Sequence, residues 1–146
     1  MSYSVDVNIL LYASDEASPF HAKAKSFLEG CSSRADLFCI PWVVVISYVR
    51  ISTHAAIFSS PLTPEDACSN VDRLLSIPRA RMLVEEDGFW EVYKEVTRTF
   101  PARGSHVSDV HLASLLKQHG VRMLYTHDSD FRRFRFLDVH SPFEEE

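Results

Sequence analysis

Two aspartates, Asp128 and Asp130, follow directly on the apolar run Met123-Leu124-Tyr125. The run has the length and composition of a strand, so both carboxylates would stand at its carboxyl end. Carboxylate-rich sites of this kind suit hard divalent ions such as Mg²⁺ or Mn²⁺, which bind one or two carboxylates together with water and substrate phosphate. The spacing therefore predicts a metal site at the end of this strand.

Two more aspartates occupy comparable junctions between elements. Asp6 closes the strand-like run Tyr3-Ser4-Val5 and opens a stretch whose apolar spacing is helical. Asp109 stands at the start of a helix that Ser108 could cap and that Gly120 would end. In an open α/β sheet such junctions converge on the crevice outside the carboxyl ends of the strands. We therefore expect acids that are far apart in the sequence to share one site.

Each aspartate also has an ordinary structural explanation. Asp6 would cap the helix that follows it, and Asp109 would complement a helix dipole. Asp128 and Asp130 would form a turn. Taken singly these roles are common for aspartate, but together they explain the pattern less well than one shared site does.

Strand-like and helix-like segments alternate along the chain in the order βααβααβααβ. This order predicts an α/β fold with a mostly parallel central sheet and helices on both faces. The expected strands cover residues 3–5, 37–40, 81–84 and 123–125, with an edge strand over 137–139 and a short helical turn over 128–134. Helix starts are expected at Ser18-Pro19, at Pro41, at Thr63-Pro64, after Asp87 and after Ser108.

The helix that follows Pro41 is the most apolar segment of the chain. Its residues Trp42, Val45, Ile46 and Val49 are expected to face the core. The apolar excess in this helix and the next indicates a surface for a homodimer or for another protein partner.

Composition limits the class of protein. A length of 146 residues predicts a single domain over 1–146, and 46% hydrophobic with 24% charged residues is typical of a folded globular protein. No apolar run is long enough to span a membrane, so a cytoplasmic location is expected. Three cysteines without C-x-x-C spacing indicate neither a disulfide framework nor a zinc site, and we expect Cys31, Cys39 and Cys68 to be buried.

A net charge of −5 argues against a protein that holds nucleic acid through overall positive potential. It leaves room for a nuclease, because the arginines are grouped. Local groups such as Arg132, Arg133 and Arg135 can still contact phosphates, although grouped charges are also common on solvated surfaces.

Several motifs, in this order, resemble the PIN-domain family, specifically the bacterial VapC-type toxins and a branch abundant in mycobacteria. They are Val5-Asp6-Val7-Asn8-Ile9-Leu10-Leu11-Tyr12-Ala13, Ser108-Asp109-Val110-His111-Leu112-Ala113, His119-Gly120-Val121 and Thr126-His127-Asp128-Ser129-Asp130-Phe131-Arg132-Arg133-Phe134. The resemblance implies a three-layer PIN sandwich and a metal-dependent endoribonuclease that cuts structured RNA, often tRNA or ribosomal RNA. It also implies a homodimer that is silenced by a VapB-type antitoxin.

The resemblance carries over to individual residues of this chain. It implies Asp6, Asp109 and Asp128 as ligands of Mg²⁺ or Mn²⁺, with Asp130 as a further catalytic residue that binds the metal directly, through water, or by orienting another group. Asn8 and Thr126 would hydrogen-bond a ligating carboxylate or a bound water. Arg50 or the pair Arg132 and Arg133 would contact RNA phosphate.

One position departs from the family pattern. Many PIN nucleases carry a glutamate three residues before the arginine that corresponds to Arg50, and this chain has Ser47 there. Residues 37–64 contain neither Asp nor Glu, so no shift of register restores the acid. A PIN domain that binds RNA or antitoxin without cleaving is therefore the main alternative. A phosphatase with Asp6 as nucleophile is a weaker one, because Asn8 stands where such enzymes usually carry a second aspartate.

Overall fold

Five short strands, all paired in parallel, form the centre of the protein. The computed structural model describes residues 1–144, so the last two residues of the expected domain lie outside it. The strands are β1 (Ser2–Val5), β2 (Leu37–Pro41), β3 (Ala80–Leu83), β4 (Met123–Tyr125) and β5 (Asp138–His140). Their order in the sheet is β3-β2-β1-β4-β5. The strands were expected within one residue of these positions.

Six α-helices and one 3-10 helix connect the strands in the expected order. They are α1 (Val7–Ser14), α2 (His21–Cys31), α3 (Trp42–Ser52), α4 (Pro64–Leu75), α5 (Phe89–Thr99), α6 (His106–Gln118) and the 3-10 helix η1 (Ser129–Arg133). No helix within residues 1–144 is both long and apolar enough to cross a bilayer.

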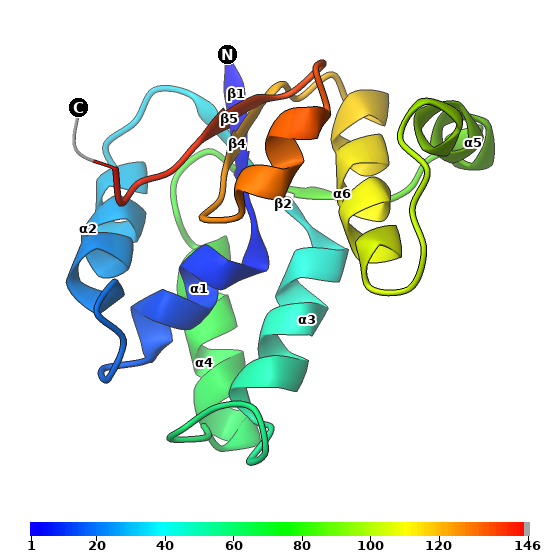
Figure 1. The fold of residues 1–146 in the computed structure, drawn as a ribbon. Coiled ribbons are helices and arrows are strands. Elements are labelled where there is room, and N and C mark those ends of the chain that lie inside the picture. Colours follow the sequence, from blue (N-terminus) through cyan, green and yellow to red (C-terminus); the bar gives the residue numbers. More distant parts are fainter. Residues whose placement is uncertain (145–146) are drawn as a thin grey trace.

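The path of the chain through the sheet places helices on both faces. From β1 the chain moves outward through β2 to β3, and then returns to β4 on the other side of β1. Because parallel crossovers are right-handed, this reversal puts the helices before and after β3 on opposite faces. Figure 1 shows α2 on one side of the strands and α6 on the other, with α5 outside α6. The α/β prediction with helices on both faces is confirmed.

The reversal also creates a topological switch point between β1 and β4, which are direct neighbours. Chains leaving two adjacent strands in opposite directions open a crevice at the carboxyl ends of those strands. Asp6 follows β1, and Thr126, His127 and Asp128 follow β4. The fold therefore brings the two predicted junctions together.

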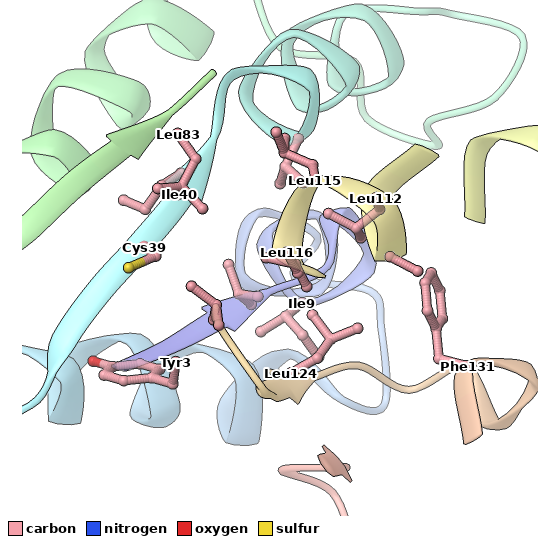
Figure 2. Packing of buried hydrophobic residues seen from close by; sticks show 14 of the residues in the cluster. Tyr3, Ile9, Cys39, Ile40, Leu83, Leu112, Leu115, Leu116, Leu124 and Phe131 are labelled. Carbon is pink, nitrogen blue, oxygen red and sulfur yellow. The ribbon is translucent and has the colours of Figure 1, made fainter. Parts of the chain in front are cut away.

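Helix α6 is held against the sheet by a buried leucine face. Leu112, Leu115 and Leu116 are at most 5% exposed and point toward the apolar side chains of β1 and β2 (Figure 2). Burying a leucine side chain contributes about 1.5–3 kcal/mol, so this face fixes the helix firmly. Asp109 lies in the first turn of α6 and is positioned by that packing.

Three predicted helix caps, at Ser18, Asp87 and Ser108, are wrong. Helix α2 begins at His21 instead of Ser18, because the Ser18 hydroxyl accepts a hydrogen bond from the Phe20 backbone N–H (3.1 Å) and closes a turn. Helix α5 is preceded by Gly88 at φ 84°, a left-handed conformation that favours glycine, so Asp87 is not its cap.

Helix α6 starts earlier than the sequence suggests. It begins at His106, so Ser108 lies within the first turn and does not cap the helix. By contrast, the Thr63 hydroxyl accepts a hydrogen bond from the Asp66 N–H (3.1 Å) and caps α4 as predicted.

The buried face of α3 differs from the predicted one. Val45 is buried as predicted, but Trp42 and Ile46 are 41% and 62% exposed, and Val44, which was not predicted to face the core, is buried. The neighbouring helices select the buried face, because the Tyr48 hydroxyl lies 2.7 Å from the Ser14 hydroxyl of α1. The expectation for cysteine also needs one correction: Cys31 and Cys39 are buried, but Cys68 is exposed on α4.

Candidate active site

The Asp6 carboxylate is fixed through both of its oxygens. Asp6 is the N-cap of α1, and its Oδ1 accepts a hydrogen bond from the Val7 N–H (2.7 Å). Its Oδ2 accepts a hydrogen bond from the Thr126 hydroxyl (2.8 Å), which comes from the end of β4. Capping and a site role are therefore not alternatives for Asp6, because one carboxylate oxygen caps the helix while the other joins the two strand ends.

Thr126 links three segments through a single hydroxyl. Besides donating to Asp6, its Oγ1 lies 3.2 Å from the Asn8 side-chain amide and accepts a hydrogen bond from the Asp128 N–H (3.0 Å). The Thr126 side chain is almost fully buried, at 2% exposure. The structure thus brings together Asn8, Thr126 and Asp6, as the sequence predicts.

Asp128 and Asp130 differ in their surroundings. Asp128 is the N-cap of η1, and its Oδ1 accepts a hydrogen bond from the Asp130 N–H (2.9 Å). The Asp130 side chain is exposed, and within residues 1–144 it makes no ion pair or side-chain hydrogen bond. The structure therefore ties Asp128 into the network and leaves the Asp130 carboxylate free in solvent beside it.

Asp109 is held by charge, at longer distances. Its Oδ2 lies 3.5 Å from Nδ1 of His106, one turn earlier on α6, and 3.6 Å from Nη2 of Arg133. His106 was not among the residues predicted for the site. With the helix start placed correctly, its position three residues before Asp109 would have indicated the contact.

Three of the aspartates influence one another electrostatically. Burial raises the pKa of Asp6 to about 6, against the opposing hydrogen bonds from Thr126 and Val7, and the negative charges of Asp109 and Asp128 raise it further. Burial also raises the pKa of Asp109, as does the charge of Asp128, while His106 and Arg133 oppose the shift. Asp6, Asp109 and Asp128 therefore form one cluster that is short of positive charge.

The donor chemistry of this cluster suits a hard divalent cation. Carboxylate oxygens are what Mg²⁺ and Mn²⁺ prefer, and a cation would offset both the burial and the weaker mutual repulsion that raise the pKa values of Asp6 and Asp109. Within residues 1–144, however, no three His, Cys, Asp or Glu side chains are arranged to hold one ion together. Asp109 is instead directed to Arg133 and His106, so the carboxylates would have to move closer together to hold an ion.

The position of the missing family acid lies on α3. Ser47 is half-buried and Arg50 is exposed. Arg50 takes part in none of the ion pairs within residues 1–144. Helix α3 therefore contributes no carboxylate to the cluster.

Comparison with known proteins identifies the fold family. The PIN domain family model matches residues 3–137, which is most of the chain. The chain belongs to the PIN-domain family. Among curated PIN relatives, "Ribonuclease VapC48" of Mycobacterium tuberculosis is 38% identical over 143 residues, which cover 98% of this chain and 99% of the relative. "Ribonuclease VapC37" of the same species is 32% identical over 130 residues, which cover 89% of this chain and 90% of the relative.

Solved structures show the same PIN fold at lower sequence identity. The VapBC2 complex from Rickettsia felis, bound to a DNA fragment from its promoter, matches with a TM-score of 0.69 at 19% identity, covering 97% of this chain and 98% of that one. VapC20 of Mycobacterium tuberculosis, described as a sarcin-ricin loop cleaving toxin, matches with a TM-score of 0.60 at 15% identity, covering 89% and 92%. The expected PIN architecture is confirmed.

Proposed function

We propose that this protein is an endoribonuclease and the toxin of a VapBC-type toxin-antitoxin system. It hydrolyses phosphodiester bonds in structured RNA such as tRNA or ribosomal RNA. The observation that carries the proposal is the cluster of Asp6, Asp109 and Asp128 at the switch point of a PIN fold. Burial and the neighbouring carboxylates raise the pKa values of Asp6 and Asp109, so a bound cation would stabilise their charged forms. Relatives of nearly equal length that carry the name ribonuclease support the same activity.

The cofactor we propose is Mg²⁺ or Mn²⁺, held by Asp6, Asp109 and Asp128. When bound, such an ion polarises a phosphoryl oxygen and makes a water nucleophilic at neutral pH. Thr126 and Asn8 keep the Asp6 carboxylate oriented, as outer partners of metal ligands commonly do. Asp130, exposed beside Asp128, is free to accept a proton from an attacking water or to bind the metal through water.

A VapB-type antitoxin and a second copy of this chain are the proposed protein partners. Several similar structures are VapBC complexes, which supports the first. Trp42 and Ile46 are exposed one turn apart on α3, and such an apolar surface supports the second. A stable monomer in dilute solution, measured by light scattering, would argue against the homodimer. Because its RNA substrates are in the cytoplasm, we propose that the protein acts there.

A second candidate is a PIN domain that binds RNA or antitoxin without cleaving. Two observations favour it: Ser47 stands where a family acid is common, and no three-ligand group is preformed within residues 1–144. This candidate predicts metal binding that depends on Asp128 without any RNA cleavage.

Cleavage mapping separates the two candidates. The purified protein is incubated with total bacterial RNA in Mn²⁺ or Mg²⁺, beside an EDTA control and the Asp109→Asn variant, and new 5′ ends are mapped. Discrete cuts that need the metal and disappear in the variant are the expected result, and they name the RNA target. Intact RNA despite measurable ion binding would reject the nuclease in favour of the binding-only candidate.

A further inference from the structure

The Arg133 guanidinium is partnered differently from those of two other arginines of the chain, Arg34 and Arg132. Its Nε and Nη2 atoms are enclosed by protein, yet neither has a hydrogen-bond partner within residues 1–144. By contrast, Arg34 donates to Tyr125 and Asp36, and Arg132 donates to both carboxylate oxygens of Glu144. Enclosed donors without partners cost free energy, and such groups call for an explanation.

The segment that carries Arg133 is rigidly anchored. Phe131 and Phe134 on either side are at most 2% exposed, and Figure 2 shows Phe131 reaching from η1 toward α6. The Arg133 guanidinium carbon lies 4.8 Å from the centre of the Phe134 ring, a cation-π distance that holds the group over the ring. The guanidinium therefore has a defined place beside Asp109.

The contact between Arg133 and Asp109 leaves the arginine unsatisfied. Nη2 lies 3.6 Å from Oδ2 of Asp109, which is an ion-pair distance but too long for a hydrogen bond. Nε and Nη2 share one edge of the guanidinium, and two parallel N–H groups on such an edge match two oxygens of a phosphate. One third of the side chain is open to solvent, while the Nε and Nη2 edge faces the protein beside Asp109.

We propose that Arg133 binds the phosphate of the RNA at the aspartate cluster, and that it rests on Asp109 while metal and RNA are absent. This inference rests on the proposed ribonuclease function. Once Asp109 turns to a metal ion, the Nε and Nη2 edge is released to the substrate phosphate. Arg133 also supplies positive charge where three carboxylates would otherwise repel an RNA backbone.

Two measurements on Arg133→Gln test the proposal with opposite expected signs. Calorimetric titration of Mn²⁺ in the absence of RNA should show binding about three- to tenfold tighter, because a positive charge beside Asp109 is gone. At saturating Mn²⁺, kcat/KM on total bacterial RNA should fall at least about tenfold, because a charged two-point contact is lost. Arg133→Lys keeps the positive charge but lacks the two parallel N–H donors of the guanidinium. This variant should leave Mn²⁺ affinity near that of the wild type and recover only part of the cleavage.

The matched control is Arg122→Gln, which removes the same charge from an exposed residue just before β4, at the opposite end of that strand from Asp128. It should leave both measurements within about twofold of the wild type, since exposed charges are screened. Weaker Mn²⁺ binding by Arg133→Gln, with full cleavage restored at saturating metal, would overturn the proposal, because Arg133 would then only position Asp109. Unchanged Mn²⁺ affinity with unchanged cleavage would overturn it as well.

Failure of the ribonuclease proposal itself is recognised separately. If the wild-type protein leaves RNA intact, gel-shift binding of total bacterial RNA in Mn²⁺ replaces the cleavage measurement. Weaker RNA binding by Arg133→Gln than by Arg122→Gln would still support the phosphate contact. Equal binding by the two variants would reject it.

Discussion

Asp6 and Asp109 belong to one cluster but are held in different ways. Both Asp6 oxygens accept hydrogen bonds of 2.7 and 2.8 Å, from the chain next to it and from the end of a neighbouring strand. Asp109 has instead an imidazole nitrogen of His106 and a guanidinium nitrogen of Arg133 as neighbours, at 3.5 and 3.6 Å. The half of the site built on β1 and β4 is therefore preorganised, while the half built on α6 and η1 is loosely paired and free to rearrange.

This difference suggests that the two halves of the site contribute to metal binding in different ways. Short hydrogen bonds between strand ends fix ligand geometry, which supports metal binding without reorganisation. Ion pairs beyond hydrogen-bonding distance exchange partners more readily, which suits a carboxylate that must turn from an arginine to an ion. Variants in each half test whether both are needed for the site.

The largest effect is expected from the two carboxylates themselves. Asp6→Asn and Asp109→Asn should each lower RNA cleavage by more than the roughly 10- to 100-fold that outer partners of metal ligands usually contribute. The loss should be similar for both, because each removes one charge from the same cluster. Cleavage rates at saturating Mn²⁺ measure it. Asp72→Asn on α4 is the matched control, and an equal loss there would contradict a local effect.

Thr126→Val should show how much the orientation of Asp6 contributes to RNA cleavage. Valine keeps the shape but removes the hydroxyl that Asp6, Asn8 and the Asp128 N–H share. Cleavage should fall about 10- to 100-fold, as expected for loss of a group that orients a ligand. Thr126→Ser restores the hydroxyl and should recover most of the activity. A Thr126→Val enzyme as active as the wild type would mean that Asp6 does not need this orientation.

The raised pKa of Asp6 predicts that the free energy of unfolding of the metal-free protein depends on pH. In the folded state Asp6 keeps its proton up to a pKa of about 6, against 3.8 for the free group, so stability falls as pH rises from about 4 to 6 and stays lower above that. Asp6→Asn removes this cost and keeps a good N-cap. In EDTA at pH 7.5 the variant should be more stable by about 2 kcal/mol, at 1.36 kcal/mol per unit of pKa with a discount for partial exposure.

Urea unfolding of the wild type and the variant at pH 4 and pH 7.5 measures this difference. It should nearly vanish at pH 4, where folded Asp6 is protonated. A variant that is less stable than the wild type at pH 7.5 would show that the hydrogen bonds to Asp6 outweigh the cost of its burial.

The smallest effect is expected from restoring the missing acid. Ser47→Glu places a carboxylate on α3 where many PIN nucleases have one, and it should tighten Mn²⁺ binding about three- to tenfold through added negative charge. Calorimetry measures the affinity, with Ser47→Gln as the uncharged control. Equal affinities for the two variants would mean that position 47 lies too far from the cluster to contribute.

The preorganised half of the site could be predicted from the sequence because it depends on local rules. An acid that ends a strand and begins a helix caps that helix, and parallel pairing places the end of β4 beside it. These rules bring Asp6 and Asp128 to the same end of the sheet, where the structure joins them to Thr126 by hydrogen bonds. Their roles at the site stay predictions. The order of strands and helices followed in the same way from alternating patterns.

The loose half could not be predicted, because it depends on how separate elements are oriented. The contact between Arg133 and Asp109 needs the direction of η1 relative to α6, and the contact with His106 needs a helix that starts before its best cap. Helix α3 shows the same limit. Apolar residues occur on nearly every side of α3, so their periodicity does not identify the face that packs against the core. The packing of the neighbouring helices leaves Trp42 and Ile46 exposed.

The most direct test of a shared metal site is calorimetric titration of Mn²⁺ into the wild type, Asp6→Asn, Asp109→Asn and the double variant, without RNA. If the preorganised and loose halves bind one ion together, each single variant should lose at least about tenfold in affinity. The double variant should lose little more, because residues that act as a unit are not additive. Normal affinity in Asp109→Asn, or losses that add fully in the double variant, would contradict a single site built from both halves.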